Sequence, residues 1–90
     1  MFGAKPPFRL AVGAVLLDGK PRTPAEVLAV LAPGYEGERL ATLDNVESQL
    51  QALKAVGVVK IADEALDAEG ELLQTYVISD YGRDKVRRNL

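Results

Sequence analysis

Residues 46–59 read VESQLQALKAVGVV, and this stretch does most to decide the fold. Together with Leu43, which lies three residues before it, the stretch carries four apolar side chains at the spacing of one helix face: Leu43, Val46, Leu50 and Leu53. Gly57 interrupts the helical pattern, and a short β-branched run over residues 58–61 follows at once. We therefore expect a helix over residues 43–56 that leads directly into a strand.

Downstream of that strand, the pattern predicts a hairpin and a final helix. Residues 72–78, LLQTYVI, are rich in strand-forming side chains. An acidic turn over residues 63–71 separates them from the first strand, so the two strands should pair antiparallel. Ser79 is placed to cap a last helix that extends to about Asn89.

Upstream, two more helices are expected. The first runs from Phe8 to Leu17 and is apolar on two sides, which favours either deep burial or a contact with a second subunit. Asp18 and Gly19 should end it. The second starts at residues 23–26, TPAE, where a threonine cap, a proline and a glutamate form a capping box, and it ends at Pro33.

The composition is that of an ordinary globular protein and excludes most catalytic chemistry. The 90 residues are 48% hydrophobic and 27% charged, with a net charge of −2. There is no cysteine and no histidine, so thiol nucleophiles, zinc–thiolate sites and the commonest general base are missing. The acidic turn lacks the first ligand of a calcium loop, because Ala65 stands there. We expect a non-enzymatic protein with no cofactor and no metal.

The same composition bounds the location and the domain count. The longest apolar run, residues 10–17, is too short to cross a bilayer, and the first residues do not read as a signal peptide. No repeat or linker divides the chain. We expect one domain over residues 1–90, located in the cytoplasm and not associated with a membrane.

The order of elements, with two marker stretches, resembles the winged-helix family of bacterial transcriptional regulators, the MarR-, ArsR- and PadR-like groups. One marker is residues 46–59, similar to the recognition helix and the start of the wing. The other is residues 76–83, YVISDYGR, similar to the last wing strand and its capped exit. The resemblance covers about residues 8–88. It implies a mainly helical α+β fold, a winged helix-turn-helix of order α-α-α-β-β-α with a two- or three-stranded wing.

The resemblance also implies a function and a set of contacts. The helix over residues 43–56 would enter the major groove of double-stranded DNA, and the hairpin over residues 58–78, the wing, would reach the backbone or the minor groove. Groove-facing residues would be Thr42, Asn45, Ser48, Gln49 and Lys54. Phosphate contacts could come from Arg22, Arg39 and Lys60. Operator symmetry in the family implies a homodimer.

An uneven charge distribution keeps a second function open. Residues 61–75 carry five carboxylates and no basic residue, whereas residues 1–22 and 81–90 each carry four basic residues and one aspartate. An acidic wing is repelled by DNA phosphates. The alternative is a winged-helix protein–protein interaction module that docks through its acidic wing onto a basic partner, without binding DNA.

Overall fold

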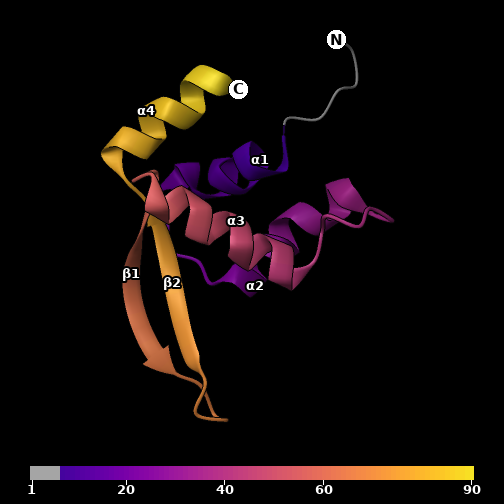
Figure 1. The fold of residues 1–90 in the computed structure, drawn as a ribbon, viewed down its shortest axis with the longest axis vertical. Coiled ribbons are helices and arrows are strands. Elements are labelled where there is room, and N and C mark those ends of the chain that lie inside the picture. Colours follow the sequence, from indigo (N-terminus) through magenta and orange to yellow (C-terminus); the bar gives the residue numbers. More distant parts are fainter. Residues whose placement is uncertain (1–6) are drawn as a thin grey trace.

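Four helices and one hairpin make up the part of the chain that the structure, a computed structural model, describes, residues 7–90 (Figure 1). In chain order the elements are α1 (Phe8–Val15), the 3-10 turn η1 (Leu16–Asp18), α2 (Pro24–Leu31), the 3-10 turn η2 (Ala32–Tyr35), α3 (Leu43–Ala55), β1 (Val59–Leu66), β2 (Leu72–Ile78) and α4 (Asp80–Asn89). The expected order of helices and strands is confirmed.

Side chains cap three of the helices, and two of the caps, Thr23 and Ser79, are those that the sequence indicated. Thr23 Oγ1 accepts a hydrogen bond from the Glu26 amide at 3.2 Å, and the Glu26 carboxylate accepts from the Thr23 amide at 2.8 Å, which completes the capping box of α2. Thr42 caps α3 through the Asn45 amide. Ser79 caps α4 through the Gly82 amide at 2.8 Å. Local sequence therefore fixes where these three helices begin.

The first strand of the wing is longer, and the turn shorter, than the sequence indicated. β1 and β2 pair antiparallel from Val59–Ile78 to Leu66–Leu72, with an irregularity between Ile61 and Asp63. The acidic stretch from residue 63 therefore begins inside a strand, and only residues 67–71 form the turn. The carboxylate of Asp67 holds that turn, because it accepts hydrogen bonds from the amides of Glu69 and Glu71 at 3.0 and 2.9 Å.

The hydrophobic core lies where α1, α2 and α3 meet the base of the wing. Its fully buried side chains come from all of these elements: Val12, Leu16, Val27, Val46, Leu50, Val59 and Tyr76. At the far end of the wing Leu66 is 70% exposed. The wing thus stands out from the bundle on a buried base (Figure 1). α1 ends two residues earlier than expected, at Val15, because the 3-10 turn η1 follows it.

The two marker stretches of the sequence contact each other at the start of α4. The Ser79 hydroxyl donates to the carbonyl oxygen of Gly57 at 2.6 Å and also lies 3.0 Å from that of Val58. Gly82 packs against the Val58 backbone so closely that a Cβ there would lie 2.7 Å from its carbonyl carbon. The end of α3, the wing and α4 are therefore locked together at one joint.

Candidate nucleic-acid interface

α3 presents an outer face beside the wing. Val46, Leu50 and Leu53 bury the inner face. The opposite face and β2 enclose a groove of about 450 Å³, which we call the wing groove. From α3 it is lined by Asp44, Glu47, Ser48 and Gln51, which we call the outer stripe, and from the other side by Pro24, Leu72, Leu73, Gln74 and Tyr76. α3 therefore has a solvent-open face beside the hairpin.

Two of the residues expected to face DNA lie on a different flank of α3. The side-chain nitrogen Nδ2 of Asn45 donates to the Leu40 carbonyl oxygen at 2.8 Å. The side-chain oxygen Oδ1 of Asn45 accepts from Nε2 of Gln49 at 3.3 Å. The Gln49 oxygen accepts from Arg9 Nε at 2.7 Å. Both side chains are half-buried. They form a hydrogen-bonded row that joins α3 to α1 and to the loop before α3.

The other expected base-reading residues divide between the cap and the exposed surface. Thr42 is the N-cap of α3, and its hydroxyl oxygen accepts from the Asn45 amide at 3.1 Å. Ser48 belongs to the outer stripe and is exposed. Lys54 is exposed in the last turn of α3. Of the five, the structure brings only Ser48 into the wing groove.

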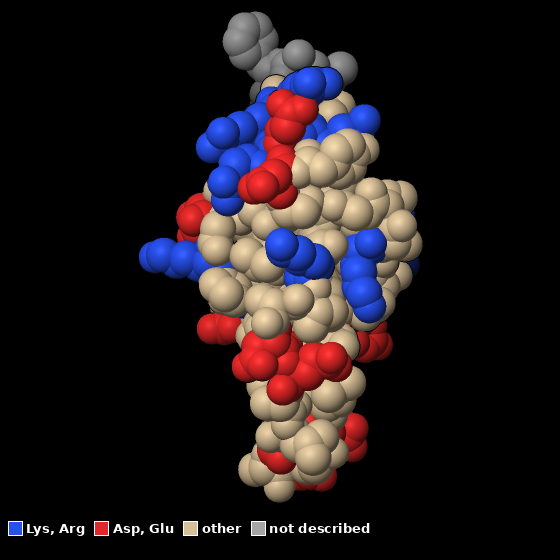
Figure 2. All heavy atoms as spheres, turned by 90° about the vertical axis from the view of Figure 1, so that its left-hand side faces the viewer, with Lys and Arg blue, Asp and Glu red and all other residues tan. Residues whose placement is uncertain are grey.

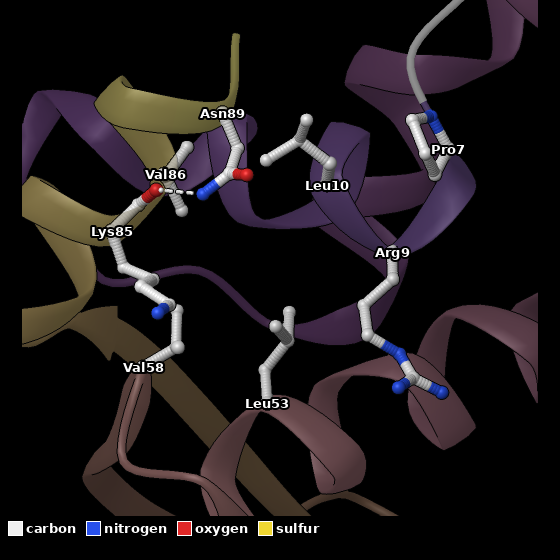
Figure 3. Close-up of a pocket in the computed structure, with 8 residues that line it drawn as sticks. All are labelled: Pro7, Arg9, Leu10, Leu53, Val58, Lys85, Val86 and Asn89. Atoms are coloured by element: carbon white, nitrogen blue, oxygen red, sulfur yellow. Dashed lines mark hydrogen bonds between the residues drawn. The ribbon is translucent and has the colours of Figure 1, made fainter.

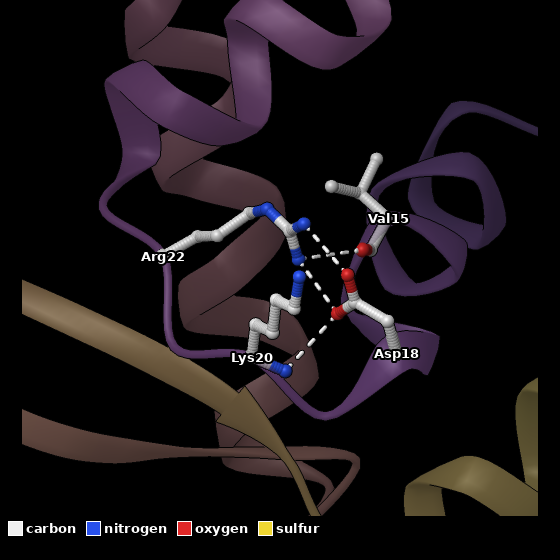
Figure 4. Close-up of polar contacts among 4 residues, drawn as sticks. All are labelled: Val15, Asp18, Lys20 and Arg22. Carbon is white, nitrogen blue, oxygen red and sulfur yellow. Dashed lines mark hydrogen bonds and ion pairs between the residues drawn. The ribbon is translucent and has the colours of Figure 1, made fainter.

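Of the three expected phosphate contacts, Arg22 is already occupied within the protein (Figure 4). Its guanidinium forms a bidentate ion pair with the Asp18 carboxylate at 2.8 and 2.7 Å and donates to the Val15 carbonyl oxygen at 3.1 Å. The Arg22 backbone also pairs with Tyr76, which adds one bridged residue to the edge of β2. Arg39, before α3, and Lys60, on β1, are both exposed.

This ion pair makes folding stability depend on pH. Hydrogen bonds from Arg22 and from the Lys20 amide hold the pKa of Asp18 far below its usual value of 3.8. A carboxyl group with a lowered pKa stabilises the fold above its usual pKa, and that contribution is lost as the pH falls below about 4.

We expect Asp18→Asn to lower the urea midpoint at neutral pH and to make its decline from about pH 4 downward shallower than in the wild type. Urea titrations at a series of pH values measure both effects. Asp84→Asn is the matched control, because Asp84 pairs with Arg88 on the exposed surface of α4. Equal acid slopes in the wild type and Asp18→Asn would contradict the role of the pair.

The wing groove has an acidic character. Tyr76 closes its floor, and its hydroxyl accepts from the Gln51 amide at 2.7 Å and lies 3.2 Å from the Gln74 oxygen. Burial raises the pKa of Tyr76, and the nearby negative charges of Glu47 and Glu64 raise it further. The outer stripe residues Asp44, Glu47 and Gln51 could be found in the sequence by their helical spacing, but the resemblance drew attention to the neighbouring flank.

Charge is unevenly spread over the surface. Figure 2 shows Lys and Arg at the end that carries α4 and across the middle of this face, whereas the wing end of this face shows carboxylates and no basic side chain. Within residues 7–90 no group of three side chains could hold a metal ion, and no helix among them is long and apolar enough to cross a membrane.

Both flanks of α1 border apolar hollows. One hollow of about 270 Å³ lies between α1 and α4, around Leu10, Leu53, Val58 and Val86 (Figure 3). Arg9 and Lys85 stand at its sides. A second, open hollow lies on the opposite side, lined by residues of α1, α2 and η2 that include Ala14, Val15 and Val30. The two apolar sides expected for this helix are thus present.

Element order, a capped third helix and a hairpin that leads into a last helix define a winged-helix fold, and comparison with solved structures confirms it. TA0346 of Thermoplasma acidophilum, a protein assigned to the transcriptional regulators, superposes with a TM-score of 0.71 at 20% identity, over 89% of this chain and 73% of that one. A transcriptional regulator homologue from Pyrococcus horikoshii superposes with a TM-score of 0.67 at 22% sequence identity, over 91% of this chain and 71% of that one.

A third solved structure contains DNA. Bacillus subtilis PadR in complex with operator DNA superposes with a TM-score of 0.72 at 12% identity, over 90% of this chain. The present chain spans 46% of the PadR chain. No protein-family model matches the sequence, and no curated protein does. At these identities, the comparisons establish the fold.

Proposed function

We propose that this protein is a small winged-helix regulator of transcription that binds double-stranded DNA, with residues 1–90 forming a single domain. The observation that carries the proposal is the arrangement of α3 and the wing, which this chain shares with a PadR structure that contains operator DNA. The role is one of binding rather than catalysis, and it implies action in the cytoplasm.

In the proposed complex, α3 enters the major groove and the wing lies along the backbone. Thr42, Ser48 and Lys54 contact DNA from α3, while Arg39 and Lys60 contact phosphates. Asn45 and Gln49 carry the amides suited to reading adenine. To do so they exchange their bonds to Leu40 and Arg9 for bonds to bases. Arg22 would have to give up its ion pair with Asp18 to reach a phosphate, so we expect it to contribute least to DNA affinity among the three phosphate-contact residues.

The experiment is fluorescence anisotropy with a random-sequence duplex at about 50 mM salt, repeated at increasing salt. We expect weak binding that falls steeply as salt rises. Lys60→Ala should lower the affinity for all duplexes and reduce the salt slope by about 1, because one phosphate contact is lost. Arg88→Ala is the control with the same charge change, since Arg88 pairs with Asp84 on α4. No binding at tens of micromolar would contradict the proposal.

We further propose that the protein acts as a homodimer. The two apolar hollows beside α1 support this, because each offers surface that a second copy could cover. Sedimentation equilibrium tests the assembly state directly. A monomer at all concentrations up to that used in the binding assay would contradict it.

A basic protein partner at the acidic wing is a second candidate contact. Leu66 and Leu72 face each other across the strands near the tip, 70% and 59% exposed, among the carboxylates of the wing. Apolar side chains surrounded by negative charge suit a basic, partly apolar surface. The structural neighbours support the DNA-binding role over a role as an interaction module alone.

A further inference from the structure

The exposed face of α3 differs from the one that carries Asn45 and Gln49. Asp44, Glu47, Ser48 and Gln51 follow one another at i, i+3, i+4 and i+7, so they form one continuous row on the helix. All four are exposed and line the wing groove. If α3 enters the DNA groove as proposed, with the wing beside it, this row faces the bases.

The two carboxylates of the row have no partner inside the described protein. Within residues 7–90 the side chains of Asp44 and Glu47 take part in no hydrogen bond and no ion pair. The amides of Asn45 and Gln49, by contrast, are bonded to Leu40, to each other and to Arg9. Binding through the carboxylates therefore requires no internal bond to break.

A carboxylate in the major groove discriminates strongly between bases. An ionised carboxylate only accepts hydrogen bonds. The amino group of cytosine is the donor that Asp and Glu side chains accept from, whereas guanine presents two acceptors, N7 and O6, which repel them. A carboxylate near phosphates also weakens contacts that do not depend on sequence.

We propose that Asp44 and Glu47 are the specificity-determining residues of α3, that they select operators with cytosine at the positions they face, and that their charge keeps the affinity for other DNA low. This inference rests on the proposed DNA-binding function. It explains why acidic residues stand on the outward face of a DNA-binding helix: they reduce non-specific affinity in exchange for discrimination.

The test compares base preference and non-specific affinity in charge-neutralised variants of nearly the same shape. Operator selection from a random library is carried out with the wild type, Glu47→Gln, Asp44→Asn and the double variant. We expect cytosine to be enriched by the wild type and each variant to lose about fivefold or more of that preference at one position. Anisotropy should show that the double variant binds random duplex more tightly than the wild type at low salt.

Glu69→Gln is the matched control, because it removes the same charge from the exposed turn of the wing. It should leave the base preference unchanged. Unaltered cytosine enrichment in the double variant would overturn this inference while leaving the proposed function intact. If neither the wild type nor the double variant binds any duplex, the proposed function itself fails, and the inference fails with it.

Discussion

Replacing Gly82 by alanine is expected to destabilise the protein by about 3 kcal/mol, because the new methyl group has no space. A Cβ at this position would overlap the carbonyl oxygen of Val58 and lie 2.7 Å from its carbonyl carbon and 2.8 Å from its Cα. These are backbone atoms, so no side-chain rotation relieves the overlap. Helix propensity alone would favour alanine by about 1 kcal/mol, and the overlap exceeds that gain.

Urea unfolding followed by circular dichroism measures the effect of Gly82→Ala. The expected loss is a large part of the 5–15 kcal/mol that a small domain has in total, so an unfolded or partly folded variant would agree with the argument. Gly34→Ala is the matched control, because nothing lies within 4 Å of the Cβ it would add. We expect that control to be neutral or slightly stabilising. Equal midpoints for the two variants would show that α4 can shift away from Val58.

Local signals predicted the elements well where a short segment determines its own structure. The capping box of Thr23 and Glu26 is an example, since both of its hydrogen bonds lie within four residues. The length of β1 was missed for the opposite reason. Asp63 and Glu64 have the composition of a loop, but pairing with β2 holds them in a strand, where the Glu64 carboxylate accepts a hydrogen bond from Gln74.

In the candidate site, too, features set by local sequence could be predicted, and features set by distant residues could not. The presence of a third helix that leads directly into a wing could be predicted, because the pattern lies in one continuous stretch of sequence. The orientation of Gln49 could not, since it depends on Arg9 in α1, forty residues away. The ion pair of Arg22 with Asp18 spans a turn containing Gly19 rather than a helix, so the usual i, i+4 spacing rule gave no reason to expect it.

Removing the side chain of Tyr76 is expected to cost about 3–5 kcal/mol, the range for truncation of large buried aromatic residues. Tyr76 is 2% exposed and is the largest fully buried side chain of the described residues. It lies opposite Ile61 in the sheet, and its backbone pairs with that of Arg22. Tyr76→Ala would leave a cavity where the wing, α3 and the start of α2 meet.

Tyr76→Phe separates packing from hydrogen bonding at the same position. The Gln51 and Gln74 amides that contact the hydroxyl both reach solvent, so water can replace it, and we expect a loss below about 1 kcal/mol. Urea unfolding measures the loss of stability in both variants, as a lower midpoint with an unchanged m-value. A similar loss for alanine and phenylalanine would mean that the hydroxyl, rather than the ring, holds the wing in place.

The phenylalanine variant also changes the response to alkali. Because burial raises the pKa of Tyr76, its stabilising contribution is complete below about pH 10 and is lost as the pH rises toward the raised value. The wild type should therefore lose stability above pH 10 more steeply than Tyr76→Phe. Since Tyr76 connects the wing to Gln51 of α3, the same ionisation would loosen the wing groove. Under the proposed function, a bound duplex that contacts both α3 and the wing should dissociate over the same pH range.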